Sequence, residues 1–147
     1  MTGFVDFKQL QRPASPNTAL TAPPGFADAA QPDAEPPVYD VAPGELYMRL
    51  LKVIAERREW QLGEQHAASM HVNFVATSPI MRFEDDVDVR ILPVAGQPGK
   101  STFAAYSRSR VGYSDLGANR GALSMGLYVA LGAIGLPFYA EIGRAHV

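Results

Sequence analysis

Residues 99–120 read GKSTFAAYSRSRVGYSDLGANR, and the fold prediction starts from this stretch. The segment 102–111 alternates with a period of two, which predicts a β-strand. Phe103 lies on one face of this strand, and Arg108 and Arg110 share the other. The two guanidinium groups then start about 7 Å apart, because two residues along a strand rise about 6.6 to 6.8 Å. The stretch therefore predicts a strand with a basic face.

A second alternating segment, DVDVRI at residues 86–91, precedes this strand. The residues between them, VAGQPGK at 94–100, are typical of a turn, so the two segments predict a β-hairpin. Its register must place the apolar side chains of both strands on one face. The register that we predict pairs Val89 with Ser107 and Ile91 with Ala105, and sets Asp88 opposite Arg108 and Asp86 opposite Arg110.

The rest of the chain predicts an α+β fold. A helix is expected from Gly44 to Arg57, where Leu46, Tyr47, Leu50, Leu51 and Ile54 form one apolar stripe. Short strands are expected at residues 38–41, 60–65 and 70–77. Ser114 and Asp115 are good N-caps for a final helix. We predict a small antiparallel sheet with two helices on one face.

The first 37 residues contain seven prolines, which predict an extended proline-rich arm. The apolar residues that could dock this arm on the domain are Phe4, Val5, Phe7 and Leu10. We therefore divide the chain into an arm (1–37), an α+β domain (38–120) and a tail.

The tail has two parts. Residues 121–140 contain no charged residue and are numerous enough to span a bilayer, although Gly126, Gly132, Gly135 and Pro137 weaken that interpretation. Residues 141–147, EIGRAHV, match the translation of a widely used sequencing adapter, and we interpret them as an artefact. The alternatives for 121–140 are a core-facing helix, a membrane anchor or out-of-frame sequence.

Composition limits the function classes. The 147 residues suffice for one core, and a net charge of −2 gives no reason to expect nucleic acid. Cysteine is absent, so disulfides and thiol chemistry are excluded. The N-terminus lacks a signal-peptide pattern, so we expect a cytoplasmic protein, with membrane association only if residues 121–140 are genuine.

The strongest candidate site is the charged face of the hairpin together with the turn that follows it. Its residues are Asp86, Asp88, Arg108, Arg110, Tyr113, Ser114, Asp115 and Asn119. Guanidinium groups match carboxylate or phosphate, so one interpretation is anion recognition. The other is a ladder of exposed ion pairs, which are individually weak.

Other site types are not supported. Ser114 lies in G-x-S-x-x-G, which lacks the G-x-S-x-G spacing of a hydrolase nucleophile. His66 and His71 lack the surroundings of a zinc site. We expect no metal and no cofactor.

The strings SRSRVGYSDLGANR and RFEDDVDVRILP, preceded in order by VDF, RPASPN and APPG, resemble the family catalogued as domain of unknown function 1499. The resemblance covers residues 4–120. It implies a compact α+β domain, found often in bacterial envelope-associated proteins, and it implies no activity. In that family the sequence normally continues into a charged amphipathic helix, and here it does not.

Three hypotheses about function follow. The first is a non-enzymatic binding or interaction module, whose partner is an anionic small molecule or an envelope component. The second is an enzyme acting on an anionic small molecule, with Asp86 or Asp88 as base and the two arginines as electrostatic stabilisers. The third is a membrane-tethered accessory domain of the bacterial envelope.

Overall fold

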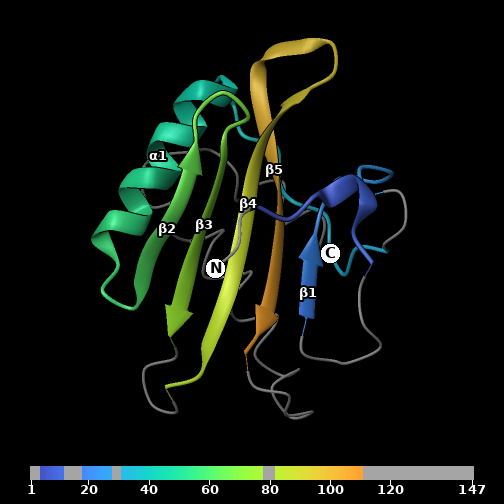
Figure 1. The fold of residues 1–147 in the computed structure, drawn as a ribbon. Helices are drawn as coiled ribbons and strands as arrows, with labels where there is room; N and C mark the ends of the chain where they lie inside the picture. Colours follow the sequence, from blue (N-terminus) through green and yellow to red (C-terminus); the bar gives the residue numbers. More distant parts are fainter. Residues whose placement is uncertain (1–3, 12–17, 28–30, 78–81, 111–147) are drawn as a thin grey trace, which may run out of the picture.

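The structure is a computed structural model that describes residues 4–11, 18–27, 31–77 and 82–110 (Figure 1). In this part of the chain, five strands form one antiparallel sheet in the order β1-β5-β4-β3-β2. The strands are β1 (Thr18–Thr21), β2 (Trp60–His66), β3 (His71–Thr77), β4 (Glu84–Val94) and β5 (Gln97–Ser109). One α-helix, α1 (Pro43–Glu56), and one short 3-10 helix, η1 (Phe7–Gln9), accompany the sheet.

The prediction of an α+β fold with two helices on one face is wrong. The described ranges contain a single α-helix, and strands make up most of their regular structure. The second helix was expected after Ser114, which lies outside the described residues. The predicted strand at 38–41 is also wrong, because Tyr39 makes only an isolated bridge with Ser101. Conversely, β1 was not predicted, since it lies within the proline-rich region.

The β4–β5 hairpin is longer than predicted and turns at Ala95 and Gly96 alone. Gly96 has a φ of 74°, a conformation that glycine adopts without steric cost. This tight turn, with an irregularity at Pro93, fixes the register. Val89 pairs with Ala105 rather than Ser107, so the predicted register is wrong by two residues, while the predicted sharing of faces is right.

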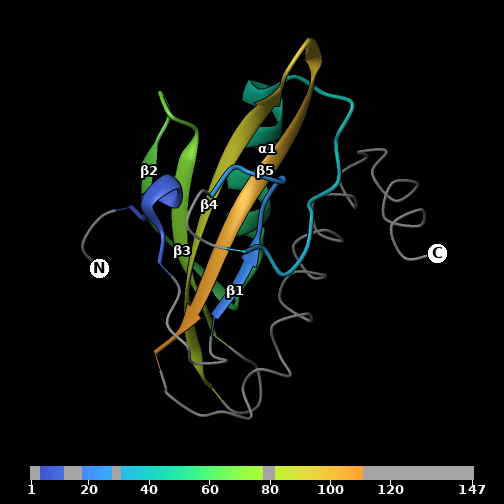
Figure 2. The same cartoon turned by 90° about the vertical axis from the view of Figure 1, so that its right-hand side faces the viewer.

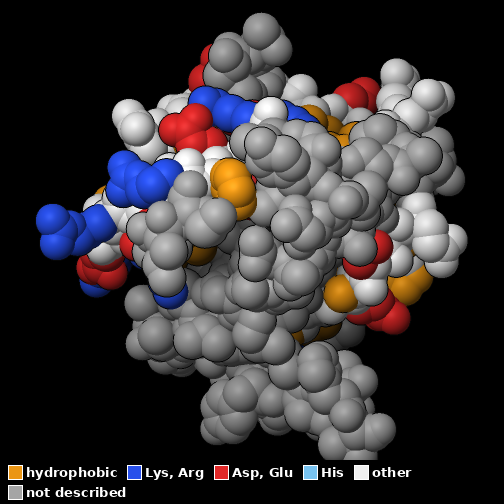
Figure 3. Space-filling model, turned by 90° about the horizontal axis from the view of Figure 1, so that it is seen from below, with side chains coloured by type: hydrophobic (Ala, Val, Ile, Leu, Met, Phe, Trp, Pro, Cys, Tyr) orange, Lys and Arg blue, Asp and Glu red, His pale blue; other side chains and the backbone are white. Residues whose placement is uncertain are grey.

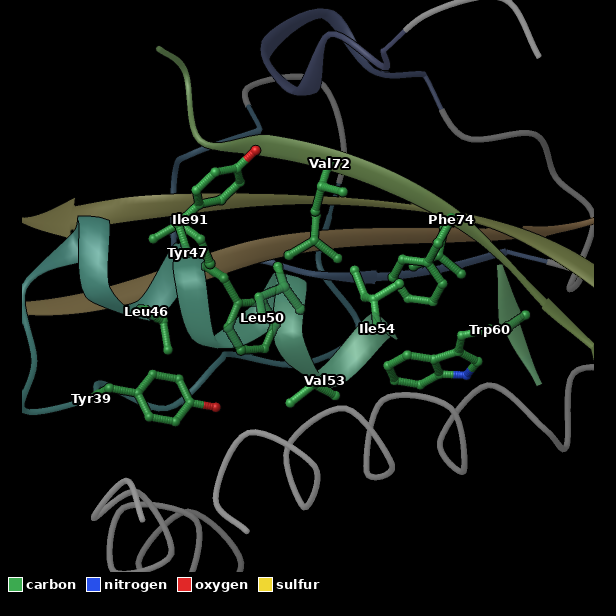
Figure 4. Close-up of a cluster of buried hydrophobic side chains, with 14 residues drawn as sticks. Tyr39, Leu46, Tyr47, Leu50, Val53, Ile54, Trp60, Val72, Phe74 and Ile91 are labelled. Carbon is green, nitrogen blue, oxygen red and sulfur yellow. The ribbon is translucent and has the colours of Figure 1, made fainter. Parts of the chain in front are cut away.

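Helix α1 packs its apolar stripe on one face of the sheet (Figure 4). Pro43 begins the helix, where its missing N–H costs nothing. Leu50 is fully buried, and Val53, which the prediction omitted, is buried as well. Leu51, which the prediction included, is only partly buried. The sheet residues in this cluster are Trp60, Val72, Phe74, Ala76, Val87, Val89, Ile91 and Phe103.

The opposite face of the sheet is covered by the N-terminal segment. Figure 2 shows η1 and α1 on opposite sides of the sheet. Phe7 is buried there, with Val5 and Leu10 packed beside it. The cluster also contains Leu20, Ala22, Ala27, Leu92, Ala104 and Tyr106. The centre of the sheet is thus covered on both faces, and this decides which of its charged side chains can meet a ligand.

The predicted tail, residues 121–147, lies outside the described residues. In the ranges that the structure does describe, no helix is both long and apolar enough to cross a membrane.

Candidate functional site

Asp88 of β4 is fully buried and forms a polar centre with three partners from distant parts of the chain. The Nη1 of Arg108 donates to its Oδ2 at 3.0 Å, and the Nε2 of His71 lies 3.0 Å from its Oδ1. The backbone N–H of Val5 also donates to Oδ1, at 3.3 Å. Because an ionised carboxylate only accepts hydrogen bonds, the Nε2 of His71 is the donor in this contact. The centre therefore ties β3, β4, β5 and the N-terminal segment together.

Aromatic rings lie against His71 and Arg108 in this polar centre. The ring of Phe4 stacks on His71 with centroids 4.2 Å apart, and the ring of Phe7 lies 5.7 Å from it. The guanidinium of Arg108 lies 5.4 Å from the centroid of the Tyr106 ring, a cation–π distance. The Asp88 carboxylate is fully buried in this arrangement and is engaged by protein groups.

The second pair, Asp86 with Arg110, is open to solvent. The Nε and Nη2 of Arg110 donate to the two carboxylate oxygens of Asp86 at 3.1 and 3.0 Å, and Nη1 donates to Glu84 Oε1 at 2.8 Å. The hydrogen bonding of Arg110 to the Asp86 carboxylate is the main cause that raises the pKa of Arg110 above its usual value. The Arg110 side chain remains 44% exposed. A guanidinium held at one position and still accessible is suited to contact a ligand.

A groove of about 260 Å³ opens beside this second pair. Strand β4 contributes Glu84 and Asp86, and Arg110 directly follows the end of β5. Strands β2 and β3 contribute Gln61, Leu62, Gly63, Asn73, Phe74 and Val75. Seen from the lower end of the sheet in Figure 1, acidic and basic side chains lie next to each other on the described surface (Figure 3). The groove thus has a charged side and a less polar side.

Asn73 connects the groove to an irregularity in β2. The β2–β3 pairing shifts between Leu62 and Gln65, and the Oδ1 of Asn73 accepts from the Glu64 N–H there at 2.7 Å. A Cβ atom at Gly63 would collide with this oxygen, so the close approach requires glycine. The Nδ2 of Asn73 is buried and has no hydrogen-bond partner among the described residues.

Comparison with known protein families identifies the family of this chain. The model of the family described as protein of unknown function, DUF1499, matches residues 11–125. The chain belongs to the DUF1499 family. The model of the BioY family matches residues 111–146, so the similarity to that family is confined to the end of the chain. No curated protein matches the sequence.

The structure brings together four of the predicted site residues of this DUF1499 protein. The pairs Asp88–Arg108 and Asp86–Arg110 both form, but diagonally, because Asp86 and not Asp88 is directly opposite Arg108 in the ladder. The other four predicted residues, Tyr113, Ser114, Asp115 and Asn119, lie outside the described residues. In the described part of the chain, no group of three or more acidic or histidine side chains is placed to hold a metal ion.

The prediction missed His71, Asn73 and Glu84 as members of this face. Their signal was present, because His71 and Asn73 alternate with the buried Val72 and Phe74 along β3. That period assigns them to the same face as the β4 aspartates once β3 and β4 are neighbours. Sequence reasoning considered His71 only as a metal ligand, so its contact with Asp88 was not foreseen.

Asp85 gives a prediction about pH. Burial raises the pKa of its carboxyl above the usual 3.8, a hydrogen bond from Ser109 lowers it, and the charge of Asp86 raises it. The folded protein therefore binds this proton more tightly than the unfolded chain, and stability falls as pH rises through and above 3.8. We expect Asp85→Asn to raise the melting temperature at pH 7. The difference in melting temperature between the variant and the parent should shrink below pH 3.8. Thermal unfolding from pH 3 to 8 measures this, and an equal difference at every pH would contradict the assignment.

Proposed function

We propose that this DUF1499 domain is a non-enzymatic binding module whose ligand occupies the groove beside Arg110, Asp86 and Glu84. The observation that supports it is the accessible Arg110 guanidinium, held by three hydrogen bonds to two carboxylates at the edge of the groove. Binding sites are typically concave, with a few polar groups fixed in position before the ligand arrives. The surface predicted from sequence is thereby narrowed to its Asp86–Arg110 half.

The Asp88–Arg108 half gives no support to an enzyme. A general base must lie within hydrogen-bond reach of the proton that it abstracts. Asp88 is fully buried, and three protein groups already donate to its carboxylate. Asp86 is engaged through both oxygens by Arg110. Neither carboxylate has the position of a base that awaits substrate.

The proposal is tested by ligand-dependent thermal unfolding of the whole chain. The probes are phosphate, citrate, glucosamine and lysinamide, each near ten times its apparent Kd or at the highest soluble concentration. A ligand at ten times Kd adds about 1.4 kcal/mol, which raises the melting temperature of a domain this size by about 3 to 8 °C. We expect at least one probe to do so. Arg110→Gln should change that shift, because an anionic probe loses its guanidinium partner, whereas an amine probe meets two carboxylates that Arg110 no longer engages.

Arg49→Gln is the matched control. Arg49 also donates two hydrogen bonds to a carboxylate, that of Glu45, on the exposed face of α1. Loss of the Arg49 guanidinium should leave every ligand-induced rise in melting temperature unchanged, because Arg49 does not line the groove. A shift that is the same in Arg110→Gln as in the parent, or the absence of any shift in the parent across the four probes, would overturn the proposal.

A further inference from the structure

We infer that the groove is built for a small protonated amine that also bears a neutral hydrogen-bond-accepting oxygen. This inference rests on the proposed function and names the chemistry of its ligand. It differs from the anion expected from the sequence. Three features of the groove lead to it: its charge, the buried amide of Asn73 and its size.

The charges that line the groove favour a cation. Two carboxylates, Glu84 and Asp86, face a single guanidinium, Arg110, so these side chains leave one excess negative charge. Arg110 already donates to both carboxylates, so an anion would have to compete with them for the same guanidinium. An ammonium group instead finds two acceptors and gains from the excess charge.

The amide of Asn73 supplies the second requirement. Its orientation is fixed, because Oδ1 accepts from the Glu64 N–H and the other amide atom must then be the donor Nδ2. Asn73 is 3% exposed and lines the groove, and its Nδ2 has no acceptor in the part of the chain that the structure describes. A buried donor without an acceptor is costly, so a ligand oxygen placed there relieves that cost.

The size of the groove limits the ligand. At about 260 Å³ it is smaller than the roughly 300 to 1,000 Å³ typical of sites for drug-sized molecules. A monosaccharide or a single amino-acid unit is the appropriate scale. Because Nδ2 itself is buried, binding requires a neighbouring side chain of the groove to move.

Paired probes test this chemistry, and nuclear magnetic resonance titration of the whole chain measures their affinities. Glucosamine has both features, N-acetylglucosamine lacks the charge, and cyclohexylamine lacks the oxygens. Lysinamide and 1,5-diaminopentane form the corresponding pair for an amino-acid source. We expect glucosamine or lysinamide to bind about tenfold more tightly than its partner lacking oxygen, the effect of one well-placed hydrogen bond. Binding of glucosamine would indicate an amino sugar as the ligand, and binding of lysinamide would indicate a basic amino-acid residue.

Two variants locate the effect. Asp86→Asn should weaken the binding of every amine probe, and should not weaken the binding of N-acetylglucosamine. Asn73→Asp keeps an acceptor for the Glu64 N–H but removes the donor, so the tenfold preference for the oxygen-bearing amine should fall to about one. This ratio is insensitive to the added charge, since both amines feel it equally. The spectra of each variant also report whether it is folded.

The outcomes separate this inference from the proposed function. Binding of phosphate or citrate at the groove, lost in Arg110→Gln, would keep the proposed function and overturn the amine chemistry. Equal affinity for amines with and without oxygen, or a preference that survives Asn73→Asp, would overturn the role of Asn73. If none of the probes perturbed the resonances of the groove residues, both the amine inference and the proposed function would be overturned.

Discussion

Asp88→Ala is expected to lower the free energy of unfolding by about 3 to 5 kcal/mol, the usual cost of removing one partner of a buried ion pair. The change leaves the Arg108 guanidinium, the His71 N–H and the Val5 N–H without their acceptor. Urea unfolding measures it. Asp40→Ala is the control, because Asp40 pairs with Lys100 on the surface, and exposed pairs contribute about 0 to 1 kcal/mol. Equal losses in the two variants would contradict a buried centre.

Exchanging the two charges sharpens this test. If Asp88 and Arg108 formed only an exposed cross-strand pair, Asp88→Arg combined with Arg108→Asp would restore most of the stability lost by either change. In the structure, Asp88 also accepts from His71 and Val5, and an arginine at position 88 can accept from neither. The exchange should therefore fail to restore stability, and full restoration would show that the other two partners are unimportant.

Leu50→Ala is expected to cost about 2 to 5 kcal/mol, through lost burial and the cavity left behind. Leu50 is fully buried between α1 and the sheet. Met48→Ala on the same helix is the control, because Met48 is 64% exposed, and surface changes stay within about 0.5 kcal/mol. Urea unfolding of both variants compares them. A loss below about 0.5 kcal/mol for Leu50→Ala would contradict the packing of α1.

The elements with strong periodicity could be predicted from sequence. The stripe of α1 and the alternation of β3, β4 and β5 identify these elements and their buried faces, because burial on one side imposes a period of 3.6 or 2. The register could not be predicted. We placed Asp88 directly opposite Arg108, whereas a long arginine side chain reaches diagonally to the neighbouring aspartate position.

The burial of Asp88 was the larger surprise. The alternating pattern of β4 is typical of a sheet with one wet face. That face is covered at its centre by Phe4, Val5 and Phe7, whose contacts are distant in sequence. Those apolar residues suggested that the N-terminal arm could dock on the domain, but they did not indicate which surface it would cover. The distinction between a buried and an exposed aspartate–arginine pair therefore depended on a tertiary contact that no local pattern encodes.

The charged face predicted from sequence divides into a buried pair, Asp88 with Arg108, and an open pair, Asp86 with Arg110, beside a groove. The measurement that tests this division most directly is the coupling free energy of each pair, from double-mutant cycles in urea unfolding. We predict about 2 kcal/mol between Asp88 and Arg108, and less than about 1 kcal/mol between Asp86 and Arg110. A coupling for Asp86 and Arg110 that equals or exceeds that of Asp88 and Arg108 would contradict the account.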